Sequence, residues 1–242
     1  RHRRQDSLHA MMARRYESYK QVVVKPFFRD HFARLDRQIV LVDALAALNA
    51  GPAAMADLET ALSEILACFR PGRGSWLSSI LSRRIDRILF AATKADHLHR
   101  TGHDRLEAIL RALCDKAIAR AEFAGAEVDA VALAAIRATR EATAGQGRNR
   151  LDCILGIPLP GQHLGGEALD GTREIAIYPG ELPADPQSAL REGRDSPDPE
   201  EAERRFIRFR PPAAHAVNGG APVFPHTRLD RALNFLIGDK IA

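Results

Sequence analysis

The sequence has few cysteines and lacks a long apolar run, and both absences narrow the class of protein. Its three cysteines, Cys68, Cys114 and Cys153, are scattered and form no C-x-x-C pair, which argues against a disulfide framework or a structural zinc site. No apolar stretch approaches the ~20 residues needed to span a bilayer, and no secretory signal follows Arg1. Together these features predict a protein of the reducing cytoplasm.

Aromatic residues are scarce too, at 6% of the chain, whereas 45% of all residues are hydrophobic. That composition supports a folded core, and its alanine and leucine favour helices and helix-covered sheet over an all-β sandwich. The phosphate-binding pattern G-x-x-x-x-G-K-[ST] is also absent, and residues 71–75 have neither its spacing nor its lysine. This chain alone is therefore not expected to hold a nucleoside triphosphate in the usual way.

Charge is distributed unevenly, although the net charge is only +4. Residues 1–37 hold ten Arg or Lys against four Asp or Glu, and residues 181–203 hold eight Asp or Glu against two Arg. Basic helices at the start are compatible with a module that binds a protein, a nucleic acid or an anionic membrane. They are also compatible with an ordinary solvated helix face, and composition alone favours this second interpretation. Aromatic and basic residues interleave only at 205–210, which argues against a nucleic-acid partner.

The middle of the chain alternates short apolar runs with amphipathic segments. Residues 39–42, 88–92 and 128–136 predict strands buried on both faces, with helices between them. This order is typical of right-handed βαβ units on a parallel sheet, whose ligands lie off the carboxyl ends of the strands. Helices are predicted at 7–20, 26–35, 55–69, 76–84, 106–117 and 226–237.

Beyond residue 144 the composition changes. Glycines and prolines predict an irregular connection up to residue 166, with short strands at 173–178 and 205–210. The acidic, proline-containing stretch at 181–203 predicts a mobile linker.

Thr93-Lys94-Ala95-Asp96 follows the second predicted strand and is the leading candidate for a nucleotide-base site. The carboxylate oxygens of Asp96 can accept from the ring N–H and the exocyclic amine of guanine, a pair of donors that adenine does not present. The aliphatic part of Lys94 can lie along the base, and Thr93 can brace the loop. A four-residue match is weak by itself, because Thr93 or Asp96 also suits the cap of a following helix.

Residues at the ends of the other two strands are further candidates. Ala138 and Thr139 follow the third strand, where GTPases place a small-residue loop whose backbone N–H contacts the guanine oxygen. Asp43 ends the first strand and qualifies by position as a ligand of Mg²⁺, but it is equally suited to cap the next helix.

Three histidines, His97, His99 and His103, cluster after Asp96. Two of them are four residues apart, a spacing that can bind a metal on one helix face. No Glu-x-x-His or cysteine accompanies them, so we interpret them as solvated histidines at a helix start. No residue is assigned a catalytic role.

Longer motifs resemble those of a known family. They are KPFFRDHF (25–32), RQIVLVD (37–43), LNAGP (48–52), TKAD (93–96), FPH (224–226), LDRAL (229–233) and LIGDK (236–240). Together they resemble the YcjX-like family of bacterial P-loop proteins over nearly the whole chain. The motifs at both ends are far more specific than the four residues of TKAD.

The resemblance implies a cytoplasmic, stress-associated protein that binds GTP or GDP with Mg²⁺ and hydrolyses GTP. It also implies that the phosphate loop and the first switch lie upstream of Arg1, and that a membrane-associated protein is a partner. One departure concerns the D-x-x-G pattern that usually ends the Mg²⁺-associated strand, because the chain has Ala46 at the glycine position. Conventional sensing of the γ-phosphate is therefore not expected here, and Gly51 is the candidate for a displaced switch.

We therefore predict an α/β fold in three parts. Residues 1–37 are a helical segment. Residues 38–144 are the C-terminal half of a P-loop GTPase-like domain, with a mostly parallel sheet and helices on both faces. Residues 145–242 are a small α+β region.

Overall fold

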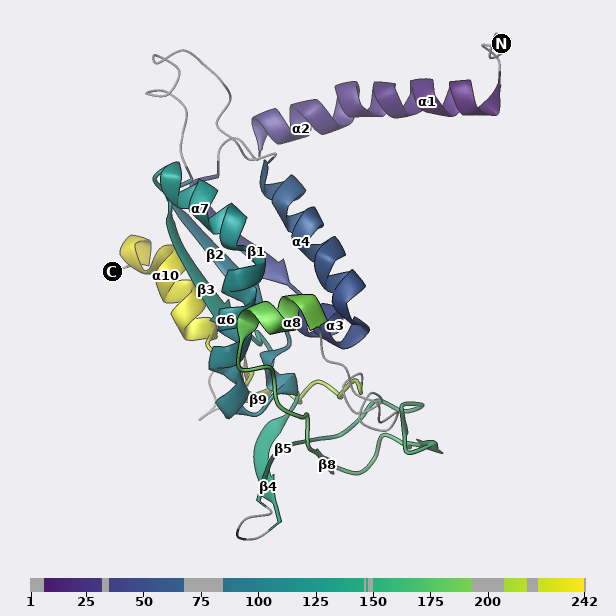
Figure 1. Ribbon diagram of the computed structural model, residues 1–242, viewed down its shortest axis with the longest axis vertical. Coiled ribbons are helices and arrows are strands. Elements are labelled where there is room, and N and C mark those ends of the chain that lie inside the picture. The colour runs from purple at the N-terminus through teal and green to yellow at the C-terminus, as the bar shows by residue number, and fades with distance from the viewer. Residues whose placement is uncertain are drawn as a thin grey trace.

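A three-stranded parallel sheet forms the centre of the computed structural model (Figure 1). The structure describes residues 7–31, 35–67, 85–145, 147, 150–192, 207–216 and 222–241. The sheet comprises β1 (Arg37–Val42), β2 (Arg87–Ala92) and β3 (Glu127–Ala132), in the order β1-β2-β3 with both pairs parallel. The three apolar runs form the predicted parallel sheet, and the α/β fold is confirmed.

Successive side chains of a strand point to opposite faces of the sheet, and helices cover both faces of β2. The edge strand β1 is covered on one face only, since Ile39 and Leu41 are 40% and 61% exposed, so the prediction of a strand buried on both faces is wrong for residues 39–42. In β2, Ile88 and Phe90 belong to one hydrophobic core, and Leu89 and Ala91 belong to another. The first core is covered by α3 (Ala44–Ala50), α4 (Pro52–Ala67), α6 (His103–Leu113), α7 (Asp115–Phe123) and α8 (Pro186–Glu192). The second core is covered by α10 (Leu229–Ile241), which Figure 1 shows on the opposite side of the sheet.

The third strand is shorter than its apolar run predicted. β3 ends at Ala132, and the backbone of Ala134 pairs with Thr227 instead of continuing the sheet. The neighbouring strand β2 ends at Ala92, whose carbonyl accepts the Leu133 N–H, and beyond this point the chain pairs with Ala95 of the loop that follows β2 and with Thr227. The residues after β3 therefore form a loop at the carboxyl edge of the sheet.

The region after residue 144 has more regular structure than its glycines and prolines predicted. β5 (Leu151–Gly156) lies inside the predicted irregular connection and pairs antiparallel with β4 (Arg140–Ala144) and β8 (Ile175–Ile177). The prediction was wrong here because β5 is stabilised by distant residues: Ile154 packs with Ile177 and Phe209. Short strands complete the region: β6 (His163–Leu164), β7 (Glu167–Ala168), β9 (His215–Ala216) and β10 (Pro222–Val223).

Part of the acidic stretch predicted as a linker is helical. α8 lies inside it, and Ala189 is completely buried in the first core. The carboxylate of Asp185 accepts hydrogen bonds from the next turn and caps the helix. Residues 193–203 lie outside the described residues. Of the strand predicted at 205–210, the described residues show a single bridge between Phe209 and Pro158. The division into three domains stays a prediction.

The N-terminal helices form one continuous rod. α1 (Leu8–Tyr19), the π-helical turn η1 (Lys20–Val24) and α2 (Lys25–Asp30) follow one another, and Figure 1 shows the rod extending away from the sheet. No residue of α1 is buried. The helix predicted at 76–84 lies outside the described residues. Among the helices that the structure describes, none has the length and apolar character needed to cross a membrane.

The last turns of α10 are attached to the amino end of the sheet by an ion pair. Arg37 donates to the two carboxylate oxygens of Asp239 at 2.8 and 2.6 Å, and Arg87 lies 3.3 Å from the same carboxylate. The hydrogen bonds from Arg37 lower the pKa of Asp239 to about 2.

We expect this ion pair to make the stability of the fold depend on pH in acid. The ordinary pKa of an aspartate, 3.8, applies in the unfolded chain, whereas the carboxylate of Asp239 stays ionised in the fold down to about pH 2. Its stabilising contribution is therefore complete above pH 3.8 and is lost as the pH falls through 2. Asp239→Asn should remove this part of the acid unfolding curve measured by circular dichroism. An unchanged curve would contradict the assignment.

Candidate functional site

The TKAD residues form a sharply turned loop, residues 93–96, at the carboxyl edge of the sheet. The Thr93 N–H donates to the last carbonyl of β1 at 2.9 Å, and the Ala95 N–H donates to the carbonyl just after β3 at 3.2 Å. Lys94 has a left-handed backbone with φ 61° and ψ 32°, a conformation that costs a residue with a side chain ~1–2 kcal/mol. The loop then enters the short helix η3 (Ala95–His97). Contacts to both neighbouring strands therefore hold the loop in a strained conformation.

Asp96 meets the loop that follows β3, residues 133–139. Its side chain is buried, and Oδ2 accepts a hydrogen bond from the Ala138 N–H at 2.8 Å. The Thr139 hydroxyl donates to the backbone carbonyl of Asp96. Neither Thr93 nor Asp96 caps η3 through its side chain. The fold thus brings together the residues that sequence analysis placed at two separate strand ends, and the alternative of a helix cap does not apply.

Asp43 lies beside the 93–96 loop and contacts Lys94. Its Oδ1 accepts a hydrogen bond from the Ala46 N–H at 3.2 Å and caps α3, which is the alternative that the sequence left open. Its Oδ2 lies 2.5 Å from the Lys94 Nζ. Both carboxylate oxygens of Asp43 are therefore engaged by groups of the protein itself.

The three histidines after Asp96 have separate structural contacts. His103 is buried, with Nε2 2.9 Å from the Ala95 carbonyl oxygen. The ring of His97 packs edge-on against that of Phe209, and His99 Nδ1 lies 2.9 Å from a threonine hydroxyl. Burial lowers the pKa of His97 and of His103. The prediction of solvated histidines is wrong: His103 is buried, the side chain of His99 is only 11% exposed, and the ring of Phe209 covers part of His97. No potential metal site with three or more ligands occurs among the described residues.

The C-terminal segment also contacts the 133–139 loop. The Arg137 N–H donates to the Pro225 carbonyl at 2.7 Å, and Ala134 and Thr227 exchange two backbone hydrogen bonds. Sequence reasoning assigned no part of the site to this segment. The sequence feature that could have indicated this contact is the pair of motifs FPH and LDRAL, but neither belongs to a recognised nucleotide-binding pattern.

A surface hollow of about 470 Å³ lies close to the site but does not coincide with it. It lies between η4 (Arg100–Gly102), β5 and residues 178–182, and its lining includes Arg105 and Asp152. None of the six predicted site residues lines it. The candidate site therefore rests on the chemistry of its residues and on their place in the sheet, and not on this hollow.

Comparison with known proteins agrees with the motifs. Residues 1–241 match the YcjX-like family, DUF463. The Ras-like GTPase YcjX of Shewanella oneidensis is 35% identical over 234 residues, which are 96% of this chain and 44% of that protein. The Ras-like GTPase YcjX of Escherichia coli K12 is 37% identical over 232 residues, again 96% of this chain and 45% of that protein. The chain thus spans less than half the length of these curated relatives, and it belongs to the YcjX-like family.

Proposed function

We propose that this chain supplies the guanine-binding part of a Ras-like GTPase. The observation that carries the proposal is the buried Asp96, held against the Ala138 N–H at the carboxyl ends of parallel strands. Ligands of open parallel sheets bind at this edge, and the names of the relatives support the GTPase class. Hydrolysis of GTP is proposed for the whole protein, because the phosphate-binding pattern is absent from these 242 residues.

Each part of the site has a chemical role in this proposal. The carboxylate of Asp96 accepts hydrogen bonds from the ring N–H and the exocyclic amine of guanine, and the stem of Lys94 covers one face of the base. The backbone of Thr93 holds the loop. The Ala138 N–H already donates to Asp96, so we propose that the Thr139 N–H is the donor to the guanine oxygen.

The test is the nucleotide preference of the full-length protein. We expect GDP to bind at least ~100-fold more tightly than ADP, because a site built to pair with the guanine edge leaves polar groups unpaired when adenine binds. Isothermal titration calorimetry with both diphosphates measures the ratio. Equal affinities would refute the guanine assignment.

The resemblance also implies Mg²⁺, with Asp43 as the candidate ligand. Both oxygens of Asp43 are engaged, by the Ala46 N–H and by Lys94, and no cluster of three possible ligands occurs within the described parts of the chain. These residues by themselves do not fit a Mg²⁺ site. The role of Asp43 as a metal ligand stays a prediction. Its contacts favour a different role for this residue, which is to hold the ammonium group of Lys94.

Asp43→Asn separates these two roles. Asparagine caps helices as well as aspartate does, so α3 should remain capped while the ion pair to Lys94 is lost. We expect GDP affinity to fall by about three- to fivefold, since the pair is partly exposed, and to fall equally in Mg²⁺ and in a chelator. Lys94→Met should give a similar loss, and the double variant should be no worse than either single one. A loss seen only in Mg²⁺ would instead support a metal ligand.

The remaining expectations from the resemblance stay predictions: a cytoplasmic location, a stress-associated role and a membrane-associated partner. So does the alternative of an interaction module that acts through the basic N-terminal helices. The exposure of α1 is compatible with it. Binding that weakens steeply with added salt would support this alternative, because such binding releases counterions.

A further inference from the structure

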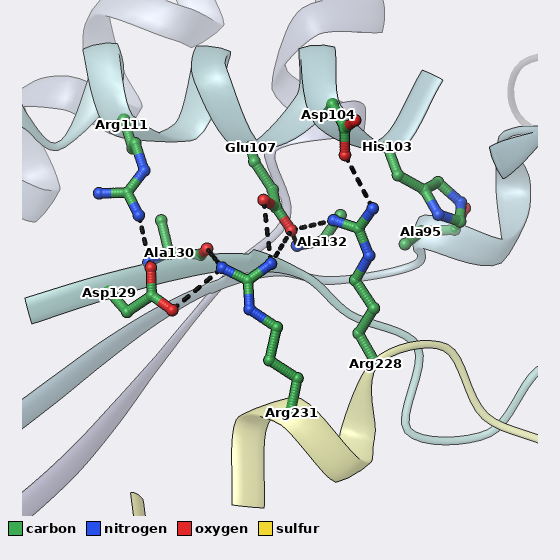
Figure 2. Close-up of polar contacts among 10 residues, drawn as sticks. All are labelled: Ala95, His103, Asp104, Glu107, Arg111, Asp129, Ala130, Ala132, Arg228 and Arg231. Carbon is green, nitrogen blue, oxygen red and sulfur yellow. Dashed lines mark hydrogen bonds and ion pairs between the residues drawn. The ribbon is translucent and has the colours of Figure 1, made fainter. Parts of the chain in front are cut away.

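The N-terminal end of α10 is tied to α6 and β3 by a cluster of ion pairs (Figure 2). Arg228 donates to Glu107 through Nη1 and to Asp104 Oδ1 at 2.8 Å through Nη2. Arg231 lies 3.3 Å from Glu107 Oε1 and 3.0 Å from Asp129 Oδ2. The side chain of Glu107 is only 14% exposed, so it sits between the two arginines with little access to water.

This cluster reaches the guanine site through the backbone. Glu107 Oε1 also accepts a hydrogen bond from the N–H of Ala132, the last residue of β3, at 2.9 Å. The loop that starts there is then held by Thr227 and Pro225, which pair with Ala134 and Arg137. The 225–231 segment thus contacts the 133–139 loop at Ala134 and at Arg137, the residue before Ala138.

The backbone of Arg228 shows that its position is strongly determined. Its φ is 56°, one of two positive values recorded for described residues other than glycine, and the other belongs to Lys94. A left-handed residue with a side chain persists when surrounding contacts compensate for its cost. Contacts hold Arg228 on both sides: its guanidinium donates to Asp104 and Glu107, and the preceding residue, Thr227, exchanges two backbone hydrogen bonds with Ala134.

We propose that Arg228 is a positioning residue of the guanine site. Through Glu107 and the 225–231 segment it holds the 133–139 loop where Ala138 can engage Asp96 and where Thr139 faces the base. This inference rests on the proposed function, because it assigns Arg228 a part in guanine recognition without contact to the nucleotide.

The test compares Arg228→Gln with Asp239→Asn in the full-length protein. Both changes break an ion pair of α10, but Asp239 lies at the amino end of the sheet, away from the loop. We expect Arg228→Gln to lower GDP affinity about tenfold, as substitutions that act through a contact network do, and Asp239→Asn to stay within about twofold of the wild type. Hydrogen exchange of residues 133–139 should rise in Arg228→Gln alone.

Two further variants keep the test decisive if Arg228→Gln fails to fold. Arg228→Gly removes the guanidinium but accepts the positive φ, and Glu107→Gln keeps the acceptor for the Ala132 N–H while removing the charge. Both should reproduce the faster exchange and the weaker GDP binding.

The outcomes separate this inference from the proposed function. Unchanged exchange and unchanged GDP affinity in the Arg228 variants would overturn the positioning role, as would an equal loss in Asp239→Asn. Faster exchange of the loop in the Arg228 variants, in a protein that binds GDP and ADP equally, would support the positioning of the loop and refute guanine recognition.

Discussion

Asp96→Asn is expected to weaken GDP binding about 100-fold in the full-length protein. Hydrogen bonds to a charged group contribute ~1.5–3 kcal/mol each, and a total loss of ~3 kcal/mol corresponds to about 100-fold in affinity. Asparagine presents one acceptor and one NH₂ donor to two guanine donors, so one of the two contacts becomes repulsive. Asp96 itself is only 5% exposed, so water does not replace the lost contact. Competition against a fluorescent GDP analogue measures the effect.

The same variant provides its own control for folding. Asparagine retains an oxygen that can accept the Ala138 N–H, so the loop should keep its place and the melting temperature should change little. Xanthosine diphosphate carries an oxygen in place of the exocyclic amine of guanine, and the NH₂ of the asparagine can donate to it. We therefore expect the variant to prefer the xanthine nucleotide. GDP affinity like that of the wild type would show that Asp96 does not read the base.

Phe90→Ala is expected to have the largest effect on stability, a loss of ~3–5 kcal/mol in the free energy of unfolding. Phe90 is 0% exposed and lies at the centre of β2, the strand that carries the 93–96 loop. Its ring belongs to the core beneath α3, α4 and α6, with Leu48 and Ile109 among its members. Removing the ring leaves a cavity that a rigid parallel sheet cannot close. Denaturant unfolding followed by circular dichroism measures the loss.

Phe123→Ala is the matched control, because the same ring is removed from a site that is 95% exposed at the end of α7. Its free energy of unfolding should change by less than ~0.5 kcal/mol, as is usual for surface substitutions. Similar losses in the two variants would mean that the core does not lie where the strand pattern and the buried residues place it.

The sheet could be predicted from the sequence, and the region after it only in part: β8 and α10 lie where a strand and a helix were predicted, whereas β5 was missed. Each of the runs 39–42 and 88–92 is apolar at consecutive positions, a local pattern that predicts a strand without knowledge of distant residues. The pattern also predicts burial on both faces, which holds for β2 but not for β1, where Ile39 and Leu41 are exposed. β5 carries no such local pattern, since Asp152 and Gly156 interrupt it. Its strand conformation depends on Ile177 and Phe209, which the fold brings from far along the chain.

The sequence by itself determined the chemistry offered at the strand ends: the carboxylate of Asp96, the stem of Lys94 and the small residues at 138–139. It determined this because parallel strands deliver the residues that follow them to one edge of the sheet. Only the tertiary structure decided how those groups are held. Three contacts hold them: Asp43 pairs with Lys94, Asp96 accepts from the Ala138 N–H, and Arg228 donates to Glu107. Each contact joins residues that are 42 or more positions apart. Such contacts depend on the packing of whole helices against the sheet, which local patterns do not encode.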